Sequence, residues 1–445
     1  METETSGIWS GRRLHFVGVG GCGMSGLALV AHQLGAEVSG SDVKSSVFTE
    51  SLAACGVSTV RLRHDAGNVP ATGEVVYSGA IQPNNVERVR ARELGLGELH
   101  RSELIAQLTR VRRTVAVAGA HGKSSTSALI AHILRSCGLE PTYIVGALLR
   151  HPGLHAAAGE GELLVIEADE SDRSLLSYDV DLAVVTNVDL DHVGDAGRYT
   201  TVDDVAATLE RFARKARRTV ATEQAAGYLP SVVDVMDVVQ PKVVSESLTR
   251  FWMDDTEYEI NQPGRHNVAN AALAVRTTRI LGCAPEQIAT ALLTFPGLVR
   301  RFELRGRTAR GARVFDDYAH HPAEIAAVLD TARLACPAGR IFAVFQPHLF
   351  SRTAQFTQDF ASALAAADRA WVEPIYPARE RPQEWTHVTS QDVVDAARRA
   401  GHTHVAASGN RERLAGELAD QACAEDVIVL VGAGDVTRMA DLLVG

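Results

Sequence analysis

The stretch TVAVAGAHGKSSTSALI, residues 114–130, decides the fold of the sequence around it. Residues 115–118 are small or β-branched and predict a short buried strand, and a glycine-punctuated turn follows at 119–122. Lys123 then opens a segment whose apolar residues recur on one face of a helix. A strand, a glycine turn, a Lys-Ser pair and a helix suit a polyphosphate, because backbone amides and the helix N-terminus meet the phosphate oxygens while the lysine neutralises them.

The match to the general phosphate-binding pattern is incomplete, because that pattern has its first glycine where this chain has Val117. The remaining GxxGKS also occurs by chance as an exposed helix start. The strand before it and the helix after it favour phosphate binding over that alternative. We call residues 119–125 the phosphate loop, and a serine hydroxyl in it can ligate Mg2+. Its expected ligand-binding residues are Gly119, His121, Gly122, Lys123, Ser124 and Ser125.

A second strand, glycine turn and helix occupies residues 14–40, and we call residues 18–23 the glycine turn. Its spacing is GxGxxG, and Asp42 follows where a dinucleotide-binding unit places an acid for ribose hydroxyls. Tight strand–helix packing is the alternative explanation of the glycines. The turn has no lysine, so we expect it to bind a diphosphate without phosphoryl transfer. Two unlike turns indicate two different phosphorylated ligands. The residues expected to bind the diphosphate ligand are Gly18, Gly20, Gly21, Gly23, Asp42 and Ser78, the last at the end of a later strand.

Acidic residues follow two further apolar runs. Glu167 comes directly after residues 163–166, where burial would be costly unless a cation met the carboxylate. Residues 181–187 predict another strand, and Asp189, Asp191 and His192 follow it. Oxygen ligands with one imidazole suit Mg2+ held partly by phosphate, whereas a zinc site would have thiols or more histidine.

The segment PGRHNVAN, residues 263–270, predicts a helix start with Asn267 and Asn270 on one face beside His266. Amides can donate to and accept from a purine edge, so we expect an adenine site. Helix capping is the alternative for Asn267. The preceding residues 223–261 predict sheet without recognisable chemistry.

A third α/β unit begins near residue 311, and its alternating strands and helices predict a mainly parallel, doubly wound sheet. Just before it, Arg300 and Arg301 are equally consistent with a phosphate contact and with a surface pair. Polar residues recur at the expected strand ends of this unit: His320, His321, His348, Arg352, Tyr376, Arg379 and residues 432–434.

The composition is that of a globular protein of about three domains, with 445 residues, 46% hydrophobic and 22% charged. A net charge of -10 argues against a nucleic-acid partner. Six cysteines without a CxxC pair suggest a reducing cytoplasm. We expect no signal peptide and no membrane insertion, because the N-terminus has no apolar core and no run of 18 apolar residues exists.

The motifs, in this order and over nearly the whole length, resemble those of the Mur ligase family. The motifs that carry the resemblance are GVGGCGMSGLA (18–28), GAHGKSS (119–125), EADESD (167–172), TNVDLDH (186–192), PGRHNVAN (263–270), RRFE (300–303), DDYAHHPAE (316–324), FQPHLFSRT (345–353) and GAGD (432–435).

The resemblance implies an α/β protein of three domains: a Rossmann-like UDP-sugar domain (1–110), a central P-loop ATPase domain (111–298) and a doubly wound C-terminal domain (299–445). It implies a cytoplasmic enzyme, a monomer or weak homodimer, that uses ATP and Mg2+ to join L-alanine to the lactyl carboxylate of UDP-N-acetylmuramate for peptidoglycan synthesis. A relative coupling another amino acid or acid, and a nucleotide sensor without turnover, are the alternatives.

The resemblance also implies residue roles. Lys123 would hold the β- and γ-phosphates, and Ser124, Glu167 and His192 would position Mg2+. Arg301 would meet the γ-phosphate. The residues expected at adenine are His266, Asn267 and Asn270, and those expected where the amino acid meets the acyl phosphate are Asp316, His320, His348 and Arg352.

Overall fold

The computed structural model describes residues 9–57, 59–190, 199–232, 234–236, 242–243 and 248–444. The described residues form two compact units. The first lies within Met1–Leu190, Arg198–Val238 and Asn270–Pro296, and the second within Val239–Ala269 and Gly297–Gly445.

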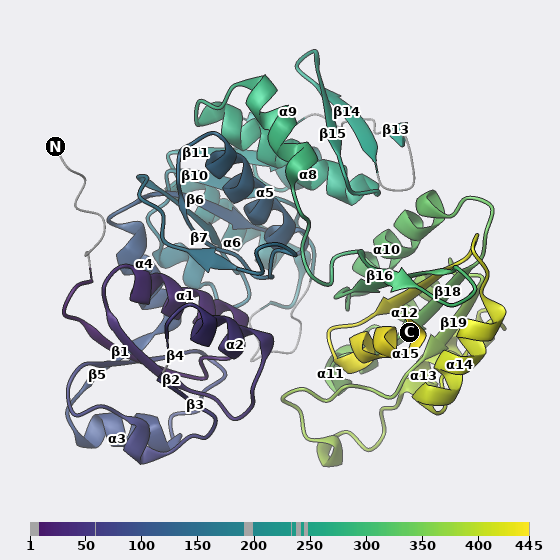
Figure 1. The fold of residues 1–445 in the computed structure, drawn as a ribbon, viewed down its shortest axis with the longest axis horizontal. Helices are drawn as coiled ribbons and strands as arrows, with labels where there is room; N and C mark the ends of the chain where they lie inside the picture. Colours follow the sequence, from purple (N-terminus) through teal and green to yellow (C-terminus); the bar gives the residue numbers. More distant parts are fainter. Residues whose placement is uncertain are drawn as a thin grey trace. The chain divides into compact units, whose positions relative to one another are not determined.

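The first unit begins with a five-stranded parallel sheet of order β3-β2-β1-β4-β5 (Figure 1). Its strands are β1 (Arg13–Val17), β2 (Glu37–Ser41), β3 (Val60–Arg61), β4 (Glu74–Tyr77) and β5 (Gly97–His100), and its helices are α1 (Cys22–Gln33), α2 (Val47–Ala54), α3 (Val86–Glu93) and α4 (Arg101–Thr109). In a parallel sheet all carboxyl ends meet at one edge, so the glycine turn, Asp42 and Ser78 share an edge as predicted.

A second sheet in the same unit has seven strands in the order β12-β11-β10-β6-β9-β7-β8. They are β6 (Arg113–Ala118), β7 (Thr142–Ile144), β8 (Ala156–Ala157), β9 (Leu163–Glu167), β10 (Leu182–Val185), β11 (Arg218–Thr222) and β12 (Asp234–Met236), with helices α5 (Lys123–Ser136), α6 (Val202–Lys215), α7 (Glu223–Ala226) and α9 (Pro285–Thr294). Within this sheet, as far as the structure describes it, only the β7–β8 pair is antiparallel. The phosphate loop joins central strand β6 to α5, which confirms the strand, turn and helix predicted there.

The two sheets of the first unit share one hydrophobic core. Helix α1 packs on β7 and β8. Gly26 makes this approach possible, because a Cβ there would lie 3.0 Å from the Ile144 side chain and 3.3 Å from Ala156.

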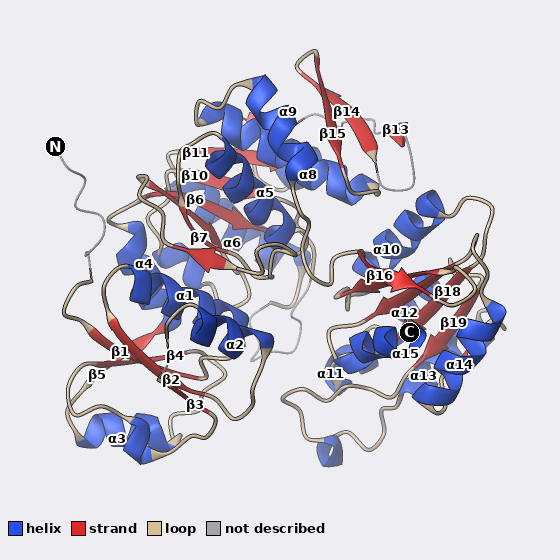
Figure 2. Ribbon diagram, in the orientation of Figure 1, coloured by secondary structure: helices blue, strands red, loops and turns tan. Residues whose placement is uncertain are grey.

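The second unit contains a six-stranded sheet of order β16-β17-β21-β18-β19-β20, parallel except for edge strand β16. Its strands are β16 (Glu303–Arg307), β17 (Arg313–Asp317), β18 (Ile341–Phe345), β19 (Arg369–Val372), β20 (Val405–Ala407) and β21 (Val427–Val431), and its helices are α10 (Pro322–Ala335), α11 (Phe350–Gln355), α12 (Thr357–Leu364), α13 (Ser390–Arg399), α14 (Arg411–Gln421) and α15 (Met439–Leu443). Helices cover both faces (Figure 2), over two separate clusters of buried side chains. The predicted doubly wound sheet is confirmed.

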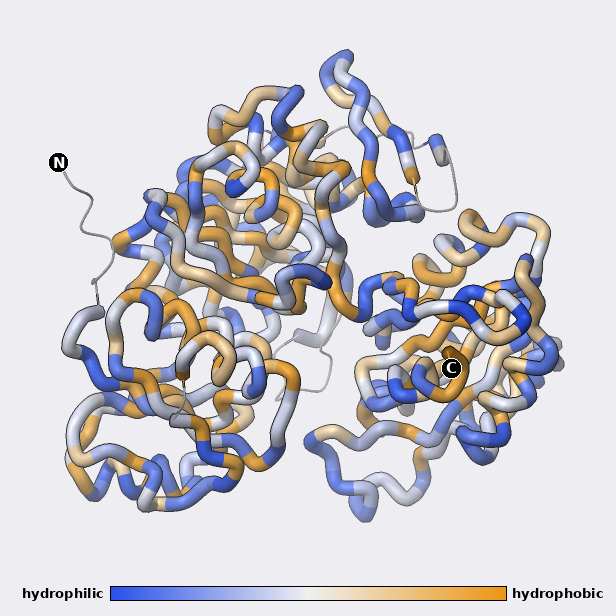
Figure 3. Tube along the Cα trace, in the orientation of Figure 1, coloured by the Kyte–Doolittle hydropathy of each residue, from blue (hydrophilic) through white to orange (hydrophobic). Residues whose placement is uncertain are grey.

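A small antiparallel sheet, β13 (Lys242–Val243), β14 (Thr249–Met253) and β15 (Thr256–Ile260), precedes helix α8 (Arg265–Ile280). The strands predicted in this part of the chain are therefore present where the structure describes it. Along the chain, apolar residues concentrate in the strands of the large sheets and polar residues in the loops (Figure 3). No helix in the described ranges is long and apolar enough to cross a membrane.

Candidate functional site

The phosphate loop depends on two glycines with left-handed backbone, Gly119 (φ 121°) and Gly122 (φ 82°). A Cβ at Gly119 would overlap Thr186, and one at Gly122 would overlap Asn270. The loop is therefore held from two sides by residues that the sequence analysis had singled out.

The ammonium of Lys123 is enclosed by its own loop and by an acid. Its Nζ donates to the carbonyls of Gly119 (2.6 Å) and Ala120 (3.1 Å) and lies 3.2 Å from Oε2 of Glu170. Burial alone would lower the pKa of Lys123, but the nearby carboxylates, Glu170 foremost, raise it above its usual value. The lysine is a permanent cation at the loop.

Glu170 is a residue that the sequence analysis missed. Its side chain is buried although it lies in the acidic run after β9, and the hydroxyl of Tyr199 donates to its backbone carbonyl (2.7 Å). The available signal was that β6 and β9 are neighbours, which brings the residues after β9 to the phosphate loop.

Glu167 and Ser124 come together as predicted. The Ser124 hydroxyl donates to Oε2 of Glu167 (3.2 Å), the Ser127 hydroxyl to Oε1 (3.4 Å), and the amide of Gly146 donates to the same carboxylate. A carboxylate and a hydroxyl at the start of α5 are oxygen donors of the kind that Mg2+ prefers. His192 and Asp191, predicted beside them, lie outside the described residues.

The segment after β10 fixes the phosphate loop from the other side. The His121 amide donates to Oδ1 of Asn187 (2.9 Å), and the Asn187 amide and Thr186 hydroxyl both donate to the His121 carbonyl (2.8 and 2.7 Å). Nε2 of His121 lies 3.3 Å from Oδ2 of Asp189. His121 is therefore held by backbone and side chain.

The predicted adenine residues have different surroundings. Oδ1 of Asn270 accepts from the Thr126 hydroxyl (3.3 Å) beside Gly122 in the first unit. Asn267 is in the second unit and lies within α8, where its side chain donates to the Pro263 carbonyl (2.7 Å). This is not a helix cap, in which the side-chain oxygen would accept from a backbone amide. Burial and the positive charge of Arg301 lower the pKa of His266 to about 4.

The glycine turn is closed by Asp42. Oδ2 of Asp42 accepts from the Gly20 amide (2.8 Å), and Oδ1 accepts from the amides of Val43 (2.7 Å) and Lys44 (3.3 Å). Asp42 thus braces the turn from the end of β2, where the sequence predicted a ribose-binding acid. Ser78 lies in the turn after β4, and its carbonyl accepts from the Ile81 amide (2.9 Å).

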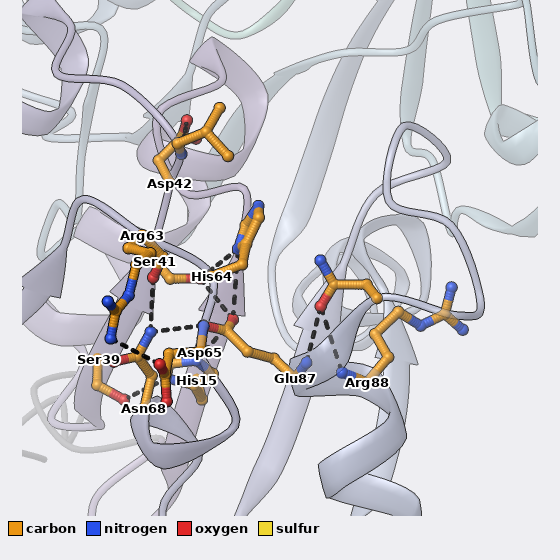
Figure 4. Close-up of polar contacts among 12 residues, drawn as sticks. His15, Ser39, Ser41, Asp42, Arg63, His64, Asp65, Asn68, Glu87 and Arg88 are labelled. Atoms are coloured by element: carbon orange, nitrogen blue, oxygen red, sulfur yellow. Dashed lines mark hydrogen bonds and ion pairs between the residues drawn. The ribbon is translucent and has the colours of Figure 1, made fainter.

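Below Asp42, a buried carboxylate ties the same edge together (Figure 4). Glu87 on α3 accepts from Ser41 Oγ (2.5 Å), Asn68 Nδ2 (2.6 Å) and the Asp65 amide (3.0 Å), and lies 3.3 Å from His15 Nε2. Burial alone would raise the pKa of Glu87, but these hydrogen bonds outweigh it and lower the pKa to about 2. No motif in the sequence pointed to this acid.

The glycine turn and Glu167 lie close together in the first unit. Cys22, in the glycine turn, donates through Sγ to the Val145 carbonyl (3.6 Å), and the residue after Val145, Gly146, donates its amide to Glu167. Burial, with the negative charge of Glu167, raises the pKa of Cys22. A ligand held at the glycine turn is therefore near the predicted magnesium ligands.

In the second unit, Arg300 binds groups of its own unit, an arrangement that matches neither a phosphate contact nor a surface pair. Its Nε lies 3.3 Å from Oδ2 of Asp316, and its guanidinium donates to the carbonyls of Gly432 and Gly434 (3.2 Å for Gly434). Asp316 is fully buried and also accepts from the Thr437 hydroxyl (2.5 Å). Arg301 extends over the ring of Tyr318, 5.6 Å from its centroid.

The predicted strand-end residues of the second unit gather at one edge. The His348 ring lies 5.8 Å from that of His320 and stacks on Tyr376 at 6.0 Å. Burial, then the charges of His320, Arg352 and Arg379, lower the pKa of His348 to about 3. His348 is therefore uncharged at neutral pH, and two arginines make its surroundings positive.

Three family models match the chain. They are described as the catalytic domain of the Mur ligase family (residues 13–113), the Mur ligase middle domain (117–226) and the Mur ligase glutamate ligase domain (300–434).

Curated relatives match over the full length. A UDP-N-acetylmuramate–L-alanine ligase of Paenarthrobacter aurescens is 39% identical, covering 100% of this chain and 99% of the relative. One from Rhizobium meliloti is 38% identical, over 97% and 96%. Among solved structures, a UDP-N-acetylmuramate-alanine ligase from Thermotoga maritima has a TM-score of 0.80 at 26% identity, covering 96% of this chain and 97% of that one.

Proposed function

The chain belongs to the Mur ligase family, and we propose that it joins L-alanine to the lactyl carboxylate of UDP-N-acetylmuramate at the expense of ATP, a step of peptidoglycan precursor synthesis. One structural observation supports this reaction in addition to family membership. The glycine turn and the phosphate loop are linked through Cys22, residues 145–146 and Glu167 within one unit, so an acid bound at the first turn can meet a nucleotide bound at the second.

The reaction follows from these groups. The carboxylate of the acceptor attacks the γ-phosphorus of ATP, the bond to ADP breaks, and an acyl phosphate forms. Lys123 is a cation at neutral pH and would neutralise charge on the transferred group, with Arg301 as a second cation. Ser124 and Glu167, with His192, would hold Mg2+, which supplies further charge neutralisation when bound.

In the second step the ammonium group of bound L-alanine loses a proton to solvent, and the free amine attacks the acyl phosphate. The C–N bond forms, the C–O bond to phosphate breaks, and the amide and phosphate are released as the nitrogen loses its second proton to solvent. His320, His348, Arg352 and Asp316 are the residues we propose around the amino acid. His348 is uncharged and so does not repel the ammonium group, while Arg352 can pair with the alanine carboxylate. We place the enzyme in the cytoplasm, where its nucleotide substrates are made, and assign it no nucleic-acid partner.

Roles at the nucleotides are proposed in the same way. The glycine turn, Asp42 and Ser78 would bind the UDP part, and Asn270 with His266 and Asn267 would bind adenine. Gly119 to Ser125 would bind the triphosphate.

A substrate panel tests the proposal. The enzyme is incubated with ATP, Mg2+, UDP-N-acetylmuramate and each of the twenty amino acids, and phosphate release is measured. We expect release with L-alanine far above that with the other amino acids. Release with another amino acid, or only with another acid, would favour a specialised relative. Tight ATP binding without release in any mixture would favour a nucleotide sensor.

A further inference from the structure

Arg101 is a cation at the substrate edge of the first sheet that no motif had singled out. It is the first residue of α4 and follows β5 directly, so it stands at the carboxyl edge that also carries the glycine turn. Helices α1 and α4 are neighbours. The guanidinium therefore reaches the turn from a separate element.

The contact with the turn is at Gly23. A Cβ added to Gly23 would overlap Nη1 of Arg101, and the next nearest atoms, Cζ at 3.5 Å and Cδ at 3.6 Å, also belong to Arg101. The last glycine of the GxGxxG pattern thus admits an arginine side chain, a role different from the close strand–helix packing expected of it.

Arg101 is half-buried, and its Nε is inaccessible and has no hydrogen-bond partner among the described residues. Within those ranges the guanidinium also makes no ion pair, unlike Arg12 and Arg88 of the same sheet, which bind Glu74 and Glu98. A cation partly removed from water without an anion is unfavourable, and a bound anion would relieve this.

The surroundings define where that anion would lie. The charge of Arg101 opposes the burial that raises the pKa of Cys22 and of Tyr178, so the guanidinium is near both the glycine turn and the connection between β9 and β10. Glu167 acts on Cys22 as well. An acid acceptor that extends from the glycine turn toward Glu167 must bring negative charge past this point.

We propose that Arg101 binds an anionic group of the acid acceptor, either its diphosphate or its carboxylate. The proposal rests on the proposed function, since it takes UDP-N-acetylmuramate as the acceptor. The planar guanidinium can donate two parallel hydrogen bonds to either group.

The first test is binding of UDP-N-acetylmuramate to wild type and to Arg101→Met, measured by calorimetry. We expect wild-type binding and an affinity loss of about 10- to 100-fold in the variant. The control Arg90→Met removes an exposed arginine of α3 and should bind like wild type. If wild type itself does not bind, the proposed function fails; if wild type and Arg101→Met bind equally, the role of Arg101 fails alone.

Two shorter ligands identify the group that is bound. UDP and UDP-N-acetylglucosamine contain the diphosphate but lack the carboxylate. An equal loss with all three ligands assigns Arg101 to the diphosphate, and a loss confined to UDP-N-acetylmuramate assigns it to the carboxylate. Either result supports the proposal.

A double-mutant cycle separates binding from a structural role. Gly23→Ala should weaken binding in the wild-type background, because the methyl group displaces the guanidinium, and should have little further effect in Arg101→Met. Unliganded Arg101→Met should melt no lower than wild type, since no hydrogen bond is lost. A lower melting temperature together with additive effects on affinity would overturn the proposal.

Discussion

Oε2 of Glu170 lies 3.2 Å from Nζ of Lys123, and the Glu170 side chain is buried against the loop that holds this lysine. The two opposite charges stabilise each other in a place that is largely shielded from water. Removing one partner would take the nearest opposite charge away from the other.

This pair predicts that Lys123→Met abolishes phosphate release and also destabilises the first unit by about 3–5 kcal/mol, the usual result of orphaning a buried charge. Lys123→Met combined with Glu170→Gln should recover much of the stability and none of the activity. Urea unfolding and phosphate release measure the two effects. Lys44→Met, which changes an exposed lysine, is the control; equal stability of the single and double variants would contradict the pairing.

Glu167→Gln should reduce kcat by about 100-fold or more, because a neutral amide is a weaker ligand than a carboxylate for the Mg2+ that would stabilise charge at the triphosphate. The Mg2+ concentration that gives half-maximal activity should be higher for this variant than for wild type. Glu162→Gln changes an exposed acid next to the same strand, paired with Arg113, and should keep wild-type kinetics. Unchanged Mg2+ dependence in Glu167→Gln would argue against Glu167 as a metal ligand.

Glu87 predicts acid sensitivity of the glycine-turn edge. Its pKa falls from an ordinary 4.5 to about 2 in the folded state, so its stabilisation is complete above pH 4.5 and is lost as the pH falls toward 2. The full effect is about 3 kcal/mol. The protection factors of residues 62–69 against hydrogen exchange should therefore fall in this range. Glu87→Gln should show fast exchange at neutral pH as well, and Glu93→Gln, exposed on the same helix, should not.

His155 predicts a second, separate pH range. It is fully buried, its Nε2 lies 2.8 Å from Ser25 Oγ of α1, and burial lowers its pKa from 6.5 to about 4. The unfolded chain then binds a proton before the folded one does, so stability falls as the pH drops from 6.5 to 4, by about 3 kcal/mol in total. In His155→Gln the melting temperature should depend less on pH between 6.5 and 4 than it does in wild type. His387→Gln, at an exposed site, should retain the wild-type profile.

The strands, glycine turns and helices around the two phosphate-binding turns were predictable, because each is determined by residues that are consecutive in the sequence. Residues 115–118 and 163–166 are apolar runs that can only be buried strands, and the glycines at 119 and 122 have the positive φ that a phosphate loop requires. The meeting of Ser124 and Glu167 was implied by the family resemblance, and the structure explains it by the pairing of β6 with β9.

Contacts between residues that are far apart in the sequence could not be predicted in this way. Glu170 looked like one acid among several, and only its burial reveals it as the partner of Lys123. Arg300 was equally consistent with a phosphate contact and with a surface pair, yet its guanidinium donates to the carbonyls of Gly432 and Gly434. Arg101 followed an unremarkable strand, and its contact with Gly23 depends on how two helices pack.

The packing of α1 on β7 and β8 through Gly26 has a consequence for building hybrid ligases. A foreign acceptor domain grafted at residue 110 would bring its own first helix, which would then face a hairpin shaped for another surface. A successful graft would have to carry residues 142–158 along with the N-terminal sheet, although they are encoded after the phosphate loop. The structural module that preserves this packing is thus discontinuous in the gene.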